Sequence, residues 1–175
     1  FVLMYVYDFL RRISGTDYYW PLDQIVDGKS VVGTVPANVH GEVKSSNSSQ
    51  NGRSVVYFRG YQAHLDARRF QDPCISNLDK CENGISVSFV IQFEDDAKTW
   101  KTNTFIVYTF EDVLQKGRGF ALYYVNGQLH TAVNTRQKRW HVFKPLQTGK
   151  NVWHHVMFTW QREKGIVLYI NGKKR

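Results

Sequence analysis

Apolar and polar residues alternate along much of the second half of the chain, which is the pattern of half-buried β-strands. In residues 85–93, for example, the alternation puts Phe89 and Ile91 on one face and Ser88 on the other. Windows that fit the spacing of an apolar helical stripe are interrupted by Gly, Asn or β-branched residues. The other segments of strand character are 105–110, 119–125, 128–133, 139–143, 151–160 and 165–170. Many short strands separated by turn residues indicate an all-β, two-sheet antiparallel sandwich or jelly roll.

Two Asn-Gly pairs follow apolar strands and predict type I′ turns, because both central residues of that turn need a positive φ. Asn126-Gly127 joins the strands at 119–125 and 128–133, so it predicts a two-residue hairpin with a fixed register. Asn171-Gly172 is followed by only three residues, and no return strand is expected after it. We therefore expect the C-terminal strands of the sandwich to be missing.

The size of the chain, 175 residues and 20.4 kDa, fits a single domain with one core. Aromatic residues make up 15% of the chain and Met only 2 residues, which favours broad pleated faces over helical packing. The apolar residues 1–10 are too few to cross a bilayer, so no transmembrane helix is expected.

Positive charge is concentrated in one part of the chain. The formal net charge is +8, from 23 Lys and Arg against 15 Asp and Glu. No acidic residue lies between Asp112 and Glu163, and the 8 basic residues of that stretch equal the whole excess. Such a block attracts polyanions such as glycan sulfates, nucleic acid or acidic lipid headgroups. The alternative is a solvated strand edge that its Lys and Arg side chains protect from aggregation.

The candidate binding residues lie in this block. A loop after the strand at 128–133 carries Arg136, Lys138 and Arg139 to the edge of the sandwich. Arginine forks pair bidentately with sulfate or carboxylate groups, so an anionic glycan is the candidate ligand, with Lys144 as a fourth contact. Residues that extend this patch if the fold brings them near are Arg68, Arg69 and Lys150.

Cys74 and Cys81 are the only two cysteines, and they lie in a segment rich in turn residues. A disulfide between them would contribute about 2.5 kcal/mol, which requires an oxidising compartment. Asn47-Ser48-Ser49 is an acceptor sequence for N-glycosylation, with Asn47 as the modified residue. Both features favour secretion. The alternative is a pair of reduced, buried thiols in a cytosolic protein.

The C-terminal strands carry a motif that resembles a known family. The pattern Trp153-x-His155-Val156, followed by Tyr169-Ile170-Asn171-Gly172, resembles the laminin-G-like and pentraxin-like modules of the concanavalin A-like jelly-roll superfamily. Together with Tyr19-Trp20-Pro21-Leu22 and the cysteine segment, it is most similar to the N-terminal module of adhesion G-protein-coupled receptors. The resemblance covers residues 17–175 and leaves residues 1–16 outside the module, as a leader or upstream remnant.

The resemblance implies two antiparallel sheets packed face to face, extracellular placement and a binding role. It matches Cys74 and Cys81 to the module's disulfide, and Trp20, Trp153 and Trp160 to structural core positions. Val90 stands where the family usually has an aromatic residue.

Catalytic chemistry is not expected. Glycan-cleaving relatives use a Glu-x-Asp-x-x-Glu strand, and this chain has Glu94 and Asp96 but Thr99 in place of the acid/base glutamate. His154 and His155 point to opposite faces of a strand and cannot chelate one ion together. Calcium is the one cofactor to consider, with Asp95 and Asp96, or Asp66, as ligands.

The sequence therefore predicts a non-catalytic extracellular recognition module of a cell-surface or matrix protein. Its expected partner is a glycan, sulfated or otherwise anionic, or an acidic protein surface. Nucleic acid is not expected outside the cell, and membrane attachment is expected only through a parent protein. The alternatives are a glycan-cleaving enzyme of the same superfamily and a purely structural spacer.

Overall fold

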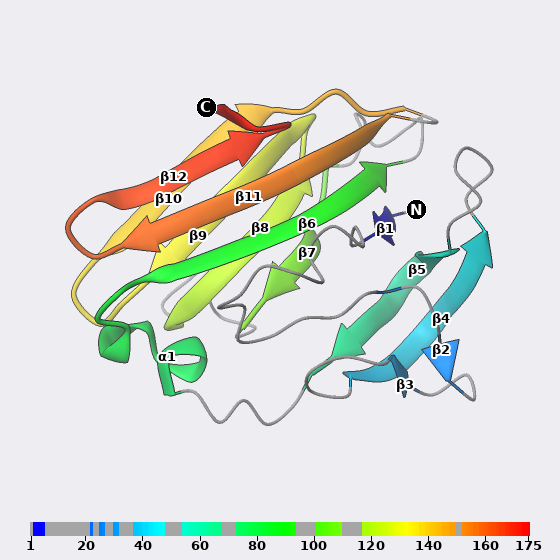
Figure 1. The fold of residues 1–175 in the computed structure, drawn as a ribbon, viewed down its shortest axis with the longest axis horizontal. Coiled ribbons are helices and arrows are strands. Elements are labelled where there is room, and N and C mark those ends of the chain that lie inside the picture. Colours follow the sequence, from blue (N-terminus) through cyan, green and yellow to red (C-terminus); the bar gives the residue numbers. More distant parts are fainter. Residues whose placement is uncertain are drawn as a thin grey trace.

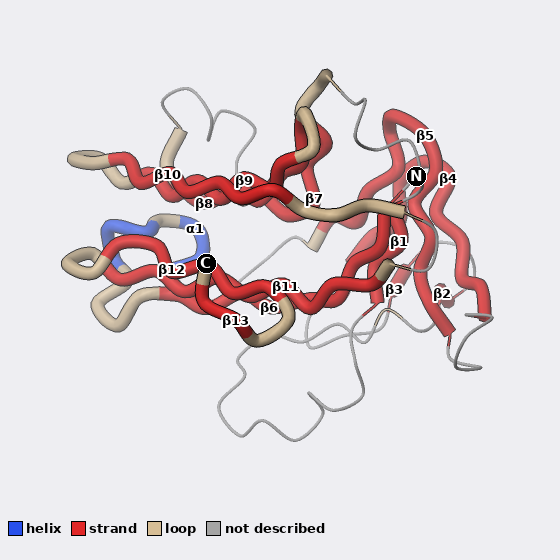
Figure 2. The backbone as a smooth tube through the Cα atoms, turned by 90° about the horizontal axis from the view of Figure 1, so that it is seen from above, coloured by secondary structure: helices blue, strands red, loops and turns tan. Residues whose placement is uncertain are grey.

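The fold is a sandwich of two antiparallel β-sheets, seen edge-on in Figure 2. The computed structural model describes residues 2–5, 22, 25–26, 30–31, 37–47, 54–67, 73–93, 101–109, 117–149 and 152–175. Among these residues, helical structure is confined to α1 (Pro73–Ser76) and the 3-10 turn η2 (Leu78–Lys80). The all-β, two-sheet architecture predicted from the alternating pattern is confirmed.

The larger sheet has nine strands among the described residues, and it contains both the earliest and the latest parts of the chain (Figure 1). Every neighbouring pair in it is antiparallel. In sheet order, its strands are β13 (Lys173–Lys174), β12 (Gly165–Ile170), β11 (Trp153–Gln161), β6 (Ile85–Phe93), β1 (Val2–Tyr5), β5 (Ser54–Asp66), β4 (Ala37–Asn47), β3 (Ser30–Val31) and β2 (Ile25–Val26).

The smaller sheet has four described strands, in the order β10 (Arg139–Pro145), β9 (Gln128–Asn134), β8 (Gly119–Val125) and β7 (Thr104–Tyr108). Asn126 and Gly127 have φ values of 50° and 76°, as the type I′ turn between β8 and β9 requires. Val125 pairs with Gln128, and the register runs unbroken to Gly119 and Asn134. The hairpin predicted from Asn126-Gly127 is confirmed.

The main core lies between the two sheets and is built from the inward-facing residues of each strand. On β11, the alternation buries Val156, Phe158 and Trp160 while Thr159 stays partly exposed. Trp160 is fully buried and meets Trp140 of the opposite sheet edge-on, with ring centroids 5.3 Å apart. The other fully or nearly fully buried members of this core are Leu78, Cys81, Phe89, Ile91, Phe93, Phe120, Leu122, Tyr124, Leu129, Val133, Leu146, Leu168 and Ile170.

Two of the three tryptophans matched to core positions can be placed. Trp160 lies in the main core as expected. Trp153 does not, because it has the opposite strand parity and packs instead against Val55 and Val90 in a small separate cluster. Trp20 lies outside the described residues.

The structure adds strands that the pattern did not predict. A two-residue return strand, β13, follows the turn at Asn171-Gly172, so the expectation that no strand returns there is wrong. Asn47 is the last residue of β4 and pairs with Ser54, so the acceptor sequence begins in a strand rather than inside a loop. Val2–Tyr5 pair with β6, and the first three of these residues also pair with β5. The domain boundary at residue 17 stays a prediction.

Candidate functional site

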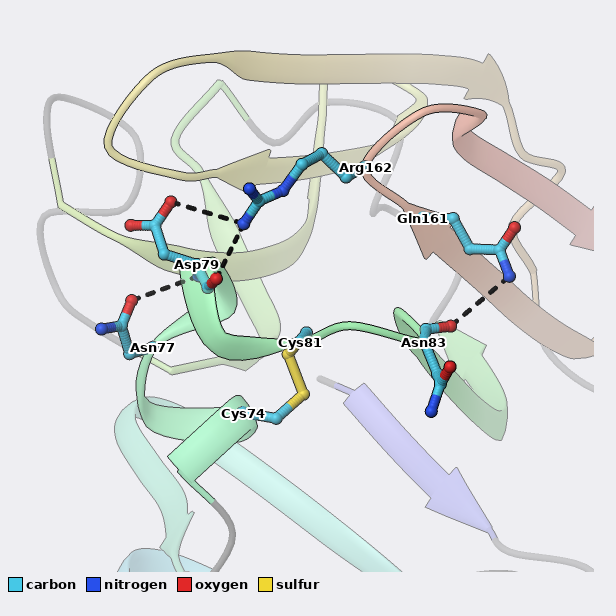
Figure 3. Close-up of a disulfide and its surroundings, with 7 residues drawn as sticks. All are labelled: Cys74, Asn77, Asp79, Cys81, Asn83, Gln161 and Arg162. Carbon is cyan, nitrogen blue, oxygen red and sulfur yellow. Dashed lines mark hydrogen bonds and ion pairs between the residues drawn. A yellow bond between two sulfur atoms is a disulfide. The ribbon is translucent and has the colours of Figure 1, made fainter.

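A disulfide holds the loop before β6 at one end of the sandwich (Figure 3). It joins Cys74 and Cys81, whose Cα atoms are 4.7 Å apart. The side chain of Asn77 accepts the Asp79 N–H at 3.2 Å and so caps η2. Leu78 is fully buried in the main core. The loop is therefore anchored by a covalent bond, a cap and a buried side chain, which leaves Asp79 in a fixed place.

Asp79 joins this loop to three other segments. Its two carboxylate oxygens accept the backbone N–H of Arg136 at 3.1 and 3.3 Å. Arg162 donates to the Asp79 carbonyl oxygen at 2.7 Å, and its guanidinium lies 4.0 Å from the carboxylate. The guanidinium of Arg118 lies 3.8 Å from the same carboxylate. The start of β8, the β9–β10 turn and the β11–β12 turn thus converge on one residue.

The β9–β10 turn is ordered by Thr135. Its backbone N–H donates to the Lys138 carbonyl at 2.9 Å, and its hydroxyl oxygen accepts the Lys138 N–H at 3.1 Å. The Lys138 ammonium then lies 5.1 Å from the centre of the Trp140 ring, within cation–π range. Arg136, Lys138 and Arg139 are all exposed.

We call these segments the basic end, defined as residues 73–84, 117–118, 135–139 and 162–164. It carries seven basic side chains against three acidic ones, all within the described part of the chain. The basic side chains are Lys80, Arg118, Arg136, Lys138, Arg139, Arg162 and Lys164. Its net charge of +4 is suited to attracting polyanions.

The structure brings together three of the four predicted ligand residues. Arg136, Lys138 and Arg139 lie at the basic end, but Lys144 lies five residues further along β10, or about 17 Å at the rise of a strand. Lys144 also has the opposite strand parity to Arg139, so the two side chains leave opposite faces. Predicted positions outside the described residues are Arg68, Arg69, Lys150, Asp95 and Asp96.

Arg118, Arg162 and Asp79 were missed as site residues. A signal for Arg118 was present in the sequence, because the register of the Asn126-Gly127 hairpin pairs Gly119 with Asn134 and so sets Arg118 beside the β9–β10 turn. No local signal exists for Asp79 or Arg162, which are 83 residues apart.

The outer face of the smaller sheet carries a second group of side chains. Phe105, Tyr123, His130 and Phe143 occupy one row across β7, β8, β9 and β10, with successive ring centroids 5.7, 4.9 and 5.3 Å apart. Phe105 and Phe143, at its two ends, are 37% and 51% exposed. We call this group the aromatic row.

His141 lies beside the aromatic row and is within hydrogen-bonding distance of two of its members. Its Nε2 is 3.1 Å from Nδ1 of His130 and 3.3 Å from the Tyr123 hydroxyl. Burial lowers the pKa of His130, and the positive charge of protonated His141 lowers it further. Burial, followed by the charge of Arg139, lowers the pKa of His141. Both shifts disfavour the protonated form of the two rings, and the 3.1 Å separation fits an N–H donated by one ring to the other.

Where the structure describes them, the other histidines and acids form no cluster of metal ligands. His154 is buried with Nε2 2.6 Å from the Gln147 carbonyl oxygen, whereas Nε2 of His155 is 2.8 Å from the Ser88 hydroxyl on the other face. Within the described ranges, no three His, Cys, Asp or Glu side chains are grouped to hold a metal. Asp66 lies at the end of β5, and calcium binding stays a prediction. In the same ranges, no helix is long and apolar enough to cross a membrane.

About two thirds of the chain match a known protein superfamily. The laminin G model described as the concanavalin A-like lectin/glucanases superfamily matches residues 60–175, about two thirds of the sequence. The chain belongs to this superfamily. The superfamily match covers every strand from within β5 to β13 and all segments of the basic end, and it confirms the resemblance in the C-terminal strands.

Two curated relatives extend the similarity beyond the superfamily match. The chain is 23% identical over 168 residues to adhesion G-protein coupled receptor D1 of Homo sapiens, covering 91% of this chain and 17% of the receptor. It is 27% identical over 143 residues to the receptor of the same name from Bos taurus, covering 78% of this chain and 14% of the receptor. The chain thus spans about a sixth of the length of these relatives. No solved structure matches it.

Proposed function

We propose that this chain is a non-catalytic extracellular recognition module that binds sulfated glycans through the basic end. The observation that carries the proposal is the convergence of Arg118, Arg136 and Arg162 around Asp79, with Lys138 and Arg139 beside them. The basic groups come from the start of β8, the β9–β10 turn and the β11–β12 turn and surround the anchored loop, so the fold, and not one run of sequence, assembles the charge. Guanidinium groups at fixed positions suit sulfate better than flexible ammonium groups do.

Extracellular placement is supported by two features. Disulfides persist in oxidising compartments, and Cys74–Cys81 anchors the loop on which the basic end is built. The two curated relatives are adhesion receptors by name. A polyanion outside the cell is most often a sulfated or carboxylated glycan, which is the ligand class that the charge of this end fits.

A pair of matched variants tests the site. Arg136→Ala/Lys138→Ala/Arg139→Ala removes three positive charges from the basic end, and Lys173→Ala/Lys174→Ala/Arg175→Ala removes three exposed ones from β13 and the residue after it. Lys173 and Lys174 pair with Ile170 and Tyr169, at the end of β12 away from the β11–β12 turn, and the Arg175 N–H donates to the Leu168 carbonyl in the middle of β12. We expect the first variant to elute from heparin at clearly lower salt than the wild type, and the second to elute much closer to it.

Four results would contradict the proposal or one of its parts. Equal shifts for both triple variants would mean that net charge alone governs retention, and unchanged elution of the first variant would exclude these residues. A protein retained by neither heparin nor dextran sulfate would behave as a spacer. Release of reducing sugars from a polysaccharide panel, abolished by Glu94→Gln, would overturn the non-catalytic assignment.

A further inference from the structure

The carboxylate of Asp79 lies among the donor groups of the basic end. Its carboxylate accepts the Arg136 N–H through both oxygens and lies 3.8 and 4.0 Å from the guanidinium groups of Arg118 and Arg162. One backbone donor and two guanidinium groups around one carboxylate form the donor set that a sulfate group also requires. The chain therefore supplies its own anion to the site.

The ion pairs of the Asp79 carboxylate are long, whereas the hydrogen bond to the Asp79 backbone carbonyl is short. The Arg118 and Arg162 side chains are 47% and 48% exposed, Asp79 is 25% exposed, and both ion pairs are near the limiting distance for a salt bridge. Exposed pairs of this kind contribute little to stability. Arg162 is held separately, by its 2.7 Å bond to the Asp79 carbonyl oxygen. Arg162 therefore does not need the carboxylate charge in order to stay where it is.

We propose that Asp79 is an intramolecular competitor that weakens the binding of sulfated glycans by occupying their donor groups. The proposal rests on the proposed function, since it concerns the same site. An incoming sulfate displaces the carboxylate from Arg118 and Arg162 and is repelled by it while it remains near. Removing the negative charge but keeping an oxygen acceptor for the Arg136 N–H therefore strengthens binding.

The variant that isolates the charge is Asp79→Asn. The asparagine amide oxygen can still accept the Arg136 N–H, and the backbone bonds at residue 79 and the cap by Asn77 are unchanged. One unit charge about 5 Å from the ligand in water corresponds to about a fourfold change in affinity. We expect Asp79→Asn to bind dextran sulfate, which carries sulfate and no carboxylate, about fourfold more tightly than the wild type.

Glu163→Gln is the matched control. Glu163 is exposed in the β11–β12 turn of the same basic end, so this variant gains the same charge without emptying the donor groups. We expect it to raise the affinity by less than half as much as Asp79→Asn. Affinities are measured by titration calorimetry or biolayer interferometry, with thermal unfolding to show that each variant is folded. Asp79→Ser, which also removes the charge and keeps an oxygen acceptor, is the second variant should Asp79→Asn unfold.

Three results would overturn the proposal. Weaker or equal binding by folded Asp79→Asn would mean that the carboxylate positions the arginines and does not compete. Equal gains for Asp79→Asn and Glu163→Gln would reduce the effect to net charge. If the wild type does not bind sulfated polymers, the proposed function itself fails. If the wild type binds through Arg136, Lys138 and Arg139 but Asp79→Asn binds no more tightly, only the competition by Asp79 is refuted and the proposed function stands.

Discussion

Gly84 and Gly172 share a backbone conformation but differ in what surrounds them. Comparing alanine variants at the two positions therefore measures how much stability depends on the close approach of Gly84 to β11. The φ values of the two glycines are +81° and +74°. A residue with a Cβ loses about 1–2 kcal/mol in this left-handed region. A Cβ on residue 84 would overlap the carbonyl oxygen of Trp160 and lie 2.8 Å from Cγ of Gln161, whereas a Cβ on residue 172 meets nothing within 4 Å.

The expected effects follow from these surroundings. Gly172→Ala is expected to lose only the conformational part, about 1–2 kcal/mol. Gly84→Ala loses that and a further amount of about 1–3 kcal/mol, because the last residues of β11 must shift to admit the methyl group. The effect of alanine on the unfolded chain is the same in both variants and cancels in the comparison. For a chain of this size, the additional loss lowers the melting temperature of Gly84→Ala by roughly 5 °C relative to Gly172→Ala.

Thermal unfolding followed by far-UV circular dichroism, with the disulfide intact, provides the measurement. Both variants should show the spectrum of a β-protein before unfolding, and Gly84→Ala should melt clearly below Gly172→Ala. Equal melting temperatures would refute the reasoning, because the chain would then relieve the overlap with the Trp160 carbonyl at no measurable cost.

Two further predictions concern stability. The double variant Cys74→Ser/Cys81→Ser should lose about 2.5 kcal/mol in urea unfolding, the loop-closure contribution of this short ring, and a loss near zero would show that the reduced loop keeps its order. The free energy of unfolding should also fall as the pH drops below about 6.5, because the lowered pKa values of folded His130 and His141 leave the unfolded chain with more bound protons. His130→Gln/His141→Gln should flatten this dependence, and an unchanged pH profile would assign it to other groups.

Strands with regular alternation could be predicted from the sequence, and so could β7 in spite of its register shift between Phe105 and Val107, whereas β4 and β5 could not. Residues 85–93 alternate except at Val90, and β6 has the predicted bounds. β4 and β5 were missed because their alternation does not stay in phase. The register of the pair shifts between His40 and Glu42, at Gly41, so apolar residues on either side of the bulge do not share one simple period.

The candidate site was only partly predictable, because some of its residues are neighbours in the sequence and others meet only in the folded chain. Arg136, Lys138 and Arg139 are neighbours in the sequence, so their gathering needs no knowledge of the fold. Lys144 could have been separated from Arg139 by strand parity alone, since five positions along a strand reverse the face. The contact between Asp79 and Arg162 depends on how the disulfide loop docks at the sandwich end, which no local pattern encodes.

The place of β1 in the sheet has a practical consequence. β5 and β6 are not neighbours, because β1 lies between them and pairs with both; Val2, for example, pairs with Phe58 on one side and Phe93 on the other. The four residues of β1 therefore provide the backbone hydrogen bonds that join β2–β5 to the strands that pack on the smaller sheet. A recombinant protein begun at Asp17 would uncover two unpaired strand borders in the middle of the sheet, the kind of surface through which β-proteins associate with one another.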